Sequence, residues 1–430
     1  MMKRVLRIIS ALMLTLAALT AVSCRSGSTL DQNHQAATEP SLEKSAHKTS
    51  EVKVDAAMTA GPLNTFGEDL FGTLDNSRSN LTVSPLSAYT ALTMAYAGAA
   101  GTTAGQLEKV LHNSLGQSVH PALSRLQGLL TSSGKDAGHS SLLIANSLWL
   151  QKEFAVRDDF LKTCQQIYGS GLKQVDFGNP EAARSAINQW AGNATNKKIS
   201  DLIQSGQLSR QTRLVLANAV YFKGNWQFPF DTAATAELPF QLSPDDRIFV
   251  PTMSREGNYN YAETGNARIL ELPYSPQGES SFSMMLILPA ISGSAPLRLR
   301  QIDHKLTGLE KRLVQVYLPK FTIRSNASLK MPLIQLGMQD AFDDGKADFS
   351  GITGDTGQKL AISDVIQNAF VEVNERGTEA AAATAVMMAT KSAMLPSDAI
   401  EFRVDRPFIF AIRENRSGAV VFWGRVVDPR

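Results

Sequence analysis

The sequence predicts an α+β fold in one large folded unit. Of its 430 residues, 43% are hydrophobic and 19% are charged, which suffices for a sizeable core and excludes a disordered chain. Residues 58–430 contain no stretch rich in Pro, Gly or Ser, no charge block and no repeat. Helical patterns come first in this stretch and strand patterns follow in blocks. Such an order favours α+β over a doubly wound sheet.

The N-terminus predicts an export signal followed by a tether. Basic residues precede a 15-residue apolar run at positions 8–22, so residues 1–23 are typical of a secretory signal peptide. Residues 19–24 (LTAVSC) also resemble a bacterial lipobox, in which Cys24 becomes the lipidated first residue, although Ala21 stands where Leu is usual. An ordinary signal peptide cut nearby, or a start-region anchor, is the alternative.

Residues 24–57 predict a flexible tether, because they are polar and lack apolar periodicity. About 33 such residues reach roughly 30 Å. We therefore expect an exported bacterial lipoprotein of the outer membrane or cell surface, anchored in the membrane through Cys24, or otherwise a secreted protein. The other cysteine, Cys164, is expected to be a small buried hydrophobe without chemistry.

Helices and strands follow from the spacing of apolar residues in the body. A helix is predicted over residues 63–74, where Leu63, Phe66, Leu70 and Phe71 recur at helical spacing, and further helices over 87–97 and 103–111. Segments rich in β-formers and bounded by Gly, Pro or polar residues predict strands. These strands cover residues 142–150, 213–222, 282–288, 313–317, 371–375 and 420–427.

Charge and motif content exclude several classes of function. The formal net charge is +2, from 42 basic and 40 acidic residues, and three of those basic residues belong to the signal peptide, so no basic face for nucleic acid is expected. Two cysteines do not make a disulfide-dense scaffold or a cysteine zinc site. No nucleophile elbow, HExxH, P-loop or GxGxxG motif occurs. We expect no metal, no cofactor and no enzymatic activity.

One segment, residues 377–392, breaks the local pattern. Its alanines favour a helix by propensity, yet it begins at Gly377 directly after a strand. The alternative is a segment that is exposed in one state and buried as a strand in another. That behaviour needs a flexible start, small side chains and no proline, and the first proline downstream is Pro396. Alternate residues would then face a core, namely Thr378, Ala380, Ala382, Thr384, Val386 and Met388.

The same segment resembles the reactive-centre loop of the serpins. Residues 374–384 (NERGTEAAAAT) are similar to the hinge of that loop, and residues 402–412 (FRVDRPFIFAI) are similar to the family signature downstream. Further matching stretches are SPLS at 84–87, GAAGTT at 98–103, NAVYFKGNW at 218–226 and YLPKF at 317–321. The chain is thereby identified as a member of the serpin family over residues 60–430.

The resemblance implies a single domain, residues 58–430, with three β-sheets, eight or nine helices and an exposed reactive-centre loop at about 376–400. Inhibitory members are suicide substrates: a serine protease forms an acyl-enzyme with the loop, and the cleaved loop then inserts into the main sheet and distorts the protease. The implied partner is a covalently trapped protease, and we expect a monomer. The hinge residues are Gly377, Thr378, Glu379, Ala380, Ala381, Ala382, Ala383 and Thr384.

Counting 17 residues from Glu375 inclusive, as in the family, puts the scissile bond between Lys391 and Ser392. Lys391 would fill the primary pocket of a trypsin-like protease, where a buried carboxylate pairs with the cation. A solvated loop lysine is the alternative. Neighbouring bonds would serve elastase-, subtilisin- or chymotrypsin-like or cysteine proteases, at Met388, Thr390 or Met394.

The resemblance also implies a network beneath the point where the main sheet opens. Ser84, Ser87 and Asn218 match its positions, and Gln367 stands where many members have histidine. Trp226 matches a tryptophan near the end of the sheet that the loop enters. Glutamine both donates and accepts hydrogen bonds, so we expect function to survive. A non-inhibitory serpin-like binding protein remains the alternative, although the hinge lacks the bulky, charged or proline residues that stop insertion.

Overall fold

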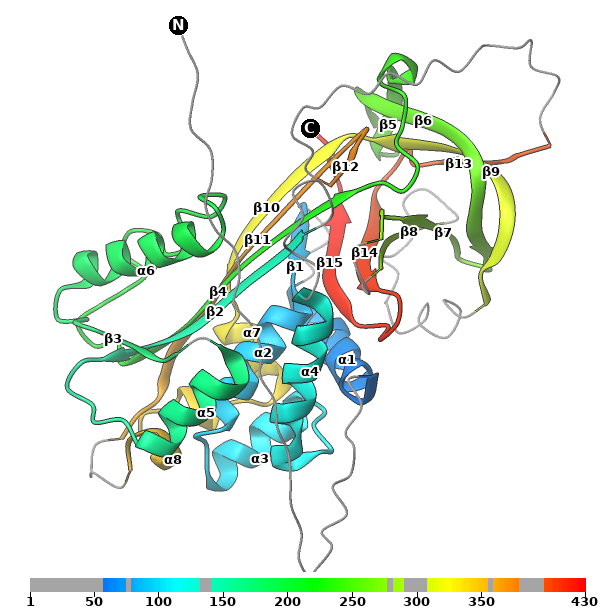
Figure 1. Ribbon diagram of the computed structural model, residues 1–430. Helices are drawn as coiled ribbons and strands as arrows, with labels where there is room; N and C mark the ends of the chain where they lie inside the picture. Colours follow the sequence, from blue (N-terminus) through cyan, green and yellow to red (C-terminus); the bar gives the residue numbers. More distant parts are fainter. Residues whose placement is uncertain are drawn as a thin grey trace, which may run out of the picture. The chain divides into compact units, whose positions relative to one another are not determined.

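The computed structural model describes residues 57–74, 79–131, 141–169, 171–276, 281–289, 308–354, 359–378 and 398–430 (Figure 1). Residues Lys53–Arg430 form one compact unit. The predicted signal peptide, nearly all of the tether and Cys24 lie outside the described residues. No helix within the described residues has the length and apolar character required to cross a bilayer.

The three helices predicted from the sequence are present, and α2 shows why such a helix begins where it does. The Ser84 side chain caps its N-terminus by accepting a hydrogen bond from the Ser87 amide, and Pro85 occupies the first turn. The helices of the described residues are α1 (Ala57–Leu74), α2 (Pro85–Tyr96), α3 (Gly101–Val110), α4 (Val119–Thr131), α5 (Asp158–Tyr168), α6 (Pro180–Ala194), α7 (Lys330–Leu336) and α8 (Ser350–Thr353).

The smaller sheet positions the site. Its order is β10 (Phe321–Ser328), β11 (Ile362–Asn374), β12 (Gly377–Thr378), β4 (Leu214–Asn225), β2 (Ser141–Gln151) and β3 (Lys173–Val175), with a further pairing of β11 to β4. β4 is buried along nearly its whole length. Apart from Asn218, residues 214–222 of this strand are apolar, as expected for a strand covered on both faces.

The larger sheet has nine strands among the described residues. Its order is β1 (Leu81–Val83), β15 (Val420–Val426), β14 (Phe408–Glu414), β8 (Phe282–Pro289), β7 (Ala267–Pro273), β6 (Asp246–Glu263), β9 (Glu310–Pro319) and β13 (Ile400–Arg403), with β5 (Ala236–Ser243) beside β6. The 18-residue β6 pairs first with β5, then with β9 and finally with β7. Two of the three sheets expected from the resemblance are therefore joined into one, because β6 runs from one into the other.

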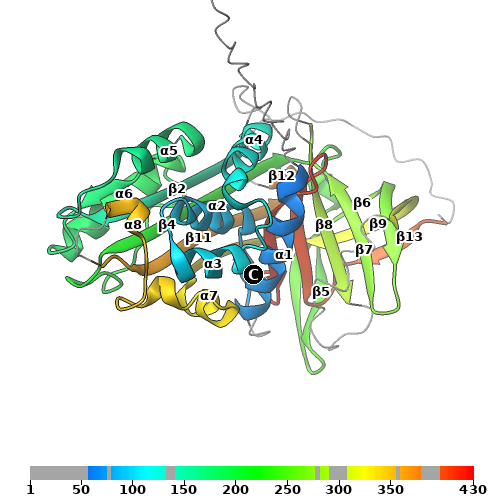
Figure 2. The same ribbon diagram turned by 90° about the horizontal axis from the view of Figure 1, so that it is seen from below.

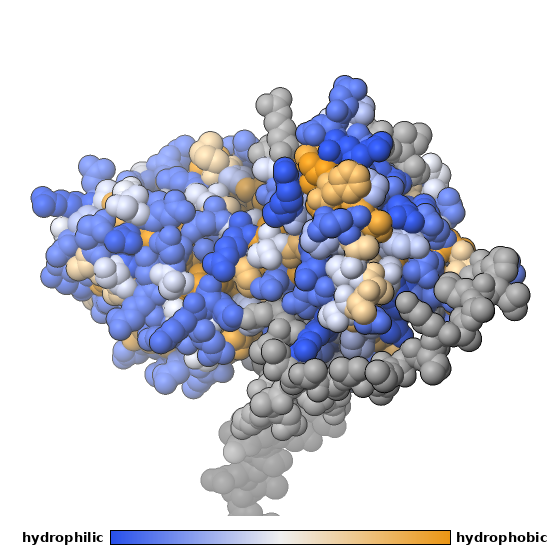
Figure 3. Space-filling view, turned by 90° about the horizontal axis from the view of Figure 1, so that it is seen from above, coloured by the Kyte–Doolittle hydropathy of each residue, from blue (hydrophilic) through white to orange (hydrophobic). Residues whose placement is uncertain are grey.

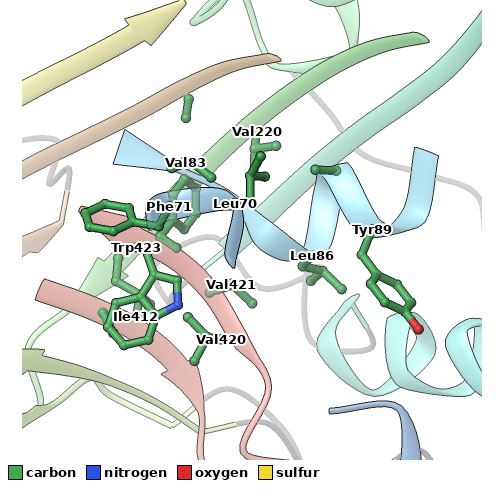
Figure 4. Packing of buried hydrophobic residues seen from close by; sticks show 14 of the residues in the cluster. Leu70, Phe71, Val83, Leu86, Tyr89, Val220, Ile412, Val420, Val421 and Trp423 are labelled. Atoms are coloured by element: carbon green, nitrogen blue, oxygen red, sulfur yellow. The ribbon is translucent and has the colours of Figure 1, made fainter. Parts of the chain in front are cut away.

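Helix α2 lies at the centre of the core, and all of its residues are buried. Leu86 of this helix lies between Val220 of β4 and Val421 of β15, and the Tyr89 side chain points away from these residues (Figure 4). Figure 2 shows α1, α2 and α3 gathered against the sheets from below. A second, smaller apolar cluster packs α6 against β2 and β4. The face seen from above is mostly hydrophilic, with one hydrophobic patch (Figure 3).

Candidate functional site

The hinge of the predicted loop enters the smaller sheet as a two-residue strand. Gly377 and Thr378 form β12, which pairs antiparallel with the end of β11 on one side and with the end of β4 on the other. Below this point, β11 and β4 pair directly with each other in parallel, from Ile362 opposite Leu214 to Phe370 opposite Tyr221. The first two residues of the segment thus lie between β11 and β4, and these two strands pair directly with each other below them.

Gly377 fits this position because it has no side chain. Its φ of +149° lies in the region that side-chain-bearing residues avoid. A Cβ atom there would lie 1.9 Å from the carbonyl oxygen of Gly224 on β4. Any other residue at 377 would therefore push β12 away from β4.

Thr378 is seated in a buried aromatic pocket. Its side chain is fully buried, and its hydroxyl lies 2.7 Å from the Tyr274 hydroxyl. The Tyr274 ring stacks on Trp226, with ring centroids 4.5 Å apart and planes 10° apart, and meets Phe222 edge to face at 5.0 Å. Burial raises the pKa of Tyr274, so its hydroxyl stays protonated. The threonine therefore has one polar partner in an otherwise apolar seat.

The turn that leads into β12 is fastened by the segment following β4. The Trp226 indole Nε1 donates to the Asn374 carbonyl at 3.0 Å, and the Trp226 amide donates to the Arg376 carbonyl at 2.8 Å. The Phe230 amide donates to the Glu375 carbonyl at 2.8 Å. Trp226 thus holds the turn before the hinge through its indole nitrogen and its backbone amide, while its ring packs on Tyr274, the partner of Thr378.

The Glu375 carboxylate connects the same turn to two other elements. Its Oε1 accepts from Thr235 at 2.9 Å and lies 3.1 Å from Lys320 Nζ, which follows β9. Burial alone would raise the pKa of Glu375, but its backbone hydrogen bond, Thr235 and Lys320 together outweigh that effect. The pKa is lowered, and the carboxylate is ionised at neutral pH.

A polar network ties β11 and β4 together along the face that meets α2. Gln367 on β11 is opposite Asn218 on β4, and Asn218 is opposite Asn146 on β2. The Gln367 side chain accepts from the Ser84 amide at 2.8 Å and donates to the Ser84 carbonyl at 3.0 Å. The Ser87 hydroxyl donates to Asn146 Oδ1 at 2.6 Å and lies 3.3 Å from Asn218 Oδ1. All five residues are buried between the sheet and α2.

The structure thus brings together Ser84, Ser87, Asn218 and Gln367 in one network, and Gly377 and Thr378 beside Trp226 at the end of the sheet. The remaining hinge residues from Glu379 to Thr384, and the predicted bond between Lys391 and Ser392, lie outside the described residues. Whether the alanine run is helical or extended is therefore not described either.

Several residues of the site were not predicted from the sequence. Asn146 had a signal, because it is a polar residue in the middle of an apolar strand. Lys320 also had one, because it lies in the YLPKF stretch at 317–321 that matches the family. Tyr274 and Thr235 had none, since Tyr274 meets Thr378 and Thr235 meets Glu375 from distant parts of the chain.

Cys164 makes no described contact with this site, and no metal-binding cluster is found among the described residues. Cys164 is buried, and burial raises the pKa of its thiol to about 12, so it carries little thiolate at neutral pH. Among the described residues, no group of three His, Cys, Asp or Glu side chains is arranged to hold a metal ion.

Known proteins share this fold and sequence. The family model described as Serpin (serine protease inhibitor) matches residues 62–429. Human leukocyte elastase inhibitor (Homo sapiens) is 39% identical over 380 residues, covering 85% of this chain and 97% of its own. A serpin-like protein of Methanosarcina acetivorans is 34% identical over 429 residues and 98% of both chains.

Solved structures agree. The chain is similar to Serpin48 of the insect Tenebrio molitor, with a TM-score of 0.72, 32% identity and coverage of 86% of this chain and 98% of that one. It is also similar to native protease nexin-1 with heparin, with a TM-score of 0.75, 30% identity and coverage of 87% and 100%. With a family model across the whole body and relatives above 30% identity over most of their length, the chain belongs to the serpins, a family of serine protease inhibitors.

Proposed function

We propose that this serpin is a suicide-substrate inhibitor that traps a serine protease by inserting its cleaved loop between β4 and β11. The observation that supports this most is the seat of Thr378: the loop already begins as a strand between the two, directly above their parallel pairing. Insertion would replace that pairing with two antiparallel ladders. β4 and β11 have 12 and 13 residues, a length that suits an insert of about 14 residues, or roughly 45 Å.

We further propose that Lys391 carries the specificity, so that a trypsin-like protease is the target. The test is to mix the full chain with trypsin, run a denaturing gel and sequence the released C-terminal peptide. A gel-stable complex and a peptide beginning at Ser392 are expected, and Lys391→Ala should abolish both with trypsin. Clean cleavage at this bond without a complex would contradict the trapping mechanism.

A second specificity is favoured by one comparison, because a 39% identical relative is a leukocyte elastase inhibitor. An elastase-like protease would cleave after a small or medium apolar residue such as Met388 or Thr390. The same gel with pancreatic elastase distinguishes the two. A faster complex with elastase, unchanged in Lys391→Ala, would replace the trypsin-like assignment while preserving the mechanism.

We also propose that Cys24 is lipidated and anchors the inhibitor to a bacterial membrane, with the polar segment after it as tether. The support is the LTAVSC sequence at residues 19–24. Membrane fractionation of cells expressing the full chain tests this. The Cys24→Ala variant is expected in the soluble fraction, and unchanged membrane association of that variant would remove the basis of the proposal.

A further inference from the structure

An open cleft of about 810 Å³ crosses the larger sheet, apart from the loop seat. Its side chains come from β6, β7, β8, β9 and β14 and from the two turns beside them. The lining residues are Gln227, Phe228, Arg255, Gly257, Asn258, Tyr259, Asn260, Glu271, Pro273, Ser283, Lys311, Arg413 and Asn415. This volume suits a small organic ligand of about monosaccharide size.

The cleft carries more positive than negative charge. Three cations, Arg255, Lys311 and Arg413, line it with a single carboxylate, Glu271, which leaves a net charge of +2. Glu271 is nearly buried, and its two oxygens are already engaged: Asn260 donates to one at 2.7 Å, and Arg413 lies 3.5 Å from the other. The negative charge of Glu271 therefore offsets that of Arg413, while the positive charges of Arg255 and Lys311 are not offset by a carboxylate of the cleft.

The strand register places Lys311 beside polar residues on one face of the larger sheet. Lys311 on β9 is directly opposite Asn260 on β6, which in turn is directly opposite Glu271 on β7. Directly opposite residues of an antiparallel pair share a face. Lys311 is exposed and makes no ion pair with any described residue. Among the described residues, its ammonium group thus has no ion-pair partner and borders the cleft.

The two arginines are held in place but incompletely satisfied. Arg255 Nη1 donates to the Pro229 carbonyl at 2.8 Å, and its guanidinium lies over the Phe228 ring at 5.4 Å. Arg413 has only its long contact to Glu271. In both side chains the Nε atom is buried without a hydrogen-bond acceptor in the structure. Buried donors without partners are uncommon, and an anion above the guanidinium groups would offset their charge.

From these contacts we infer that the cleft is a binding site for a small ligand that bears a phosphate or sulfate group. The oxyanion pairs with Lys311 and the Arg413 guanidinium, which both lie beside Asn260 and Glu271, while Arg255 lines the cleft five residues away along β6 and adds to its positive charge. The amide oxygens of Asn258, Asn260 and Asn415 are suited to accept from the hydroxyls of the remainder, because the amide nitrogens of Asn260 and Asn415 already donate to Glu271 and to Ser283.

The test is isothermal titration calorimetry of the full chain, at low salt, with inorganic phosphate, inorganic sulfate, glucose 6-phosphate and glucose. Binding of the anions but not of glucose is expected, weakening as salt rises. Phosphate as tight as glucose 6-phosphate identifies the free oxyanion as ligand, and tighter glucose 6-phosphate identifies a phosphorylated sugar-sized one.

Two variants and one matched control keep this test decisive. Lys311→Ala removes an exposed cation without disturbing the fold and should weaken binding about three- to fivefold. Arg413→Gln should weaken it about tenfold or more. Arg312→Gln removes the neighbouring cation of β9, which pairs with Glu310 and does not line the cleft, and should bind as the parent does. No anion binding at millimolar concentration, or equal affinity in all three variants, would overturn the inference.

Discussion

At the scale of single residues, the hinge depends on a few contacts made by side chains that lie far apart in the sequence. Thr378 has the Tyr274 hydroxyl as its polar partner, and Glu375 has Thr235 and Lys320. Each contact holds the start of the loop in the sheet while the loop is intact. Changing one partner should therefore alter the seat without altering the core.

Glu375→Gln tests the ionic contact. Because the folded pKa of Glu375 lies below its ordinary value of 4.5, the ionised form contributes stability above that value and loses it as pH falls through the lowered pKa. The variant should lose about 1 kcal/mol at pH 7 in urea unfolding and match the parent once the carboxyl is protonated. Glu372→Gln, on the same strand without a described ion pair, is the control. A constant difference at every pH would contradict the assignment.

Tyr274→Phe tests the hydroxyl contact. Thr378 would keep a buried hydroxyl without a partner, which costs about 1–3 kcal/mol. Release of the hinge rehydrates it, so the amides of residues 377 and 378 should exchange their hydrogens roughly tenfold faster or more. Hydrogen exchange with mass spectrometry measures this. Tyr261→Phe, which removes a hydroxyl bound to Glu263 and Arg268 instead, should leave the hinge unchanged.

At the scale of elements, the proposed insertion of the loop requires β4 and β11 to separate. Gln367 fastens β11 to α2, because its amide group both accepts from and donates to Ser84 at the start of that helix. A glutamine has no proton to gain between pH 5 and 8, so this link is the same throughout that range. Opening of the sheet should therefore show no pH dependence from this position.

Gln367→His should make the opening of the sheet depend on pH. A neutral imidazole can accept from the Ser84 amide, but a protonated imidazole has two donors and leaves that buried amide without an acceptor. Spontaneous loss of inhibitory activity on warming should then be faster at pH 5 than at pH 8, by about fivefold or more. Asn368→His places an imidazole one residue along, on the other face of β11, and serves as control. Equal rates at both pH values in Gln367→His would contradict the role given to this link.

At the scale of the whole molecule, the proposed insertion between β4 and β11 would add hydrogen bonds that the intact protein does not make. About 14 inserted residues, at about 1 kcal/mol each for their new hydrogen bonds, would add on the order of 10 kcal/mol. Spread over a body of this size, that gain corresponds to a rise of roughly 10 °C in the thermal midpoint. The intact fold is thus expected to be the less stable of two.

Cleavage of the loop by trypsin should therefore raise the unfolding temperature by roughly 10 °C, measured by calorimetry of intact and cleaved chains. Thr378→Arg puts a guanidinium where a fully buried threonine sits, so the loop should be cut without inserting. This variant should show no rise, and trypsin should turn it over as a substrate. A full rise in Thr378→Arg, or an unchanged inhibitory yield, would refute insertion through this seat.

Local pattern in the sequence was enough for the α+β class, for helices α1 to α3 and for segments of six strands (β2, β4, β8, β9, β11 and β15), because periodicity records which face of an element is buried. Helices α4 to α8 and the other nine strands of the described residues were not predicted. The hinge at Gly377 was predicted from a glycine directly after a strand and from the family resemblance. Most of the seat could not be predicted in this way. The pairing of β11 with β4, the shared ladder through β6, and the meeting of Tyr274 and Lys320 with the hinge are contacts between distant segments. Only tertiary structure decided them, since an apolar strand carries no local mark of the neighbour beside which it will be buried.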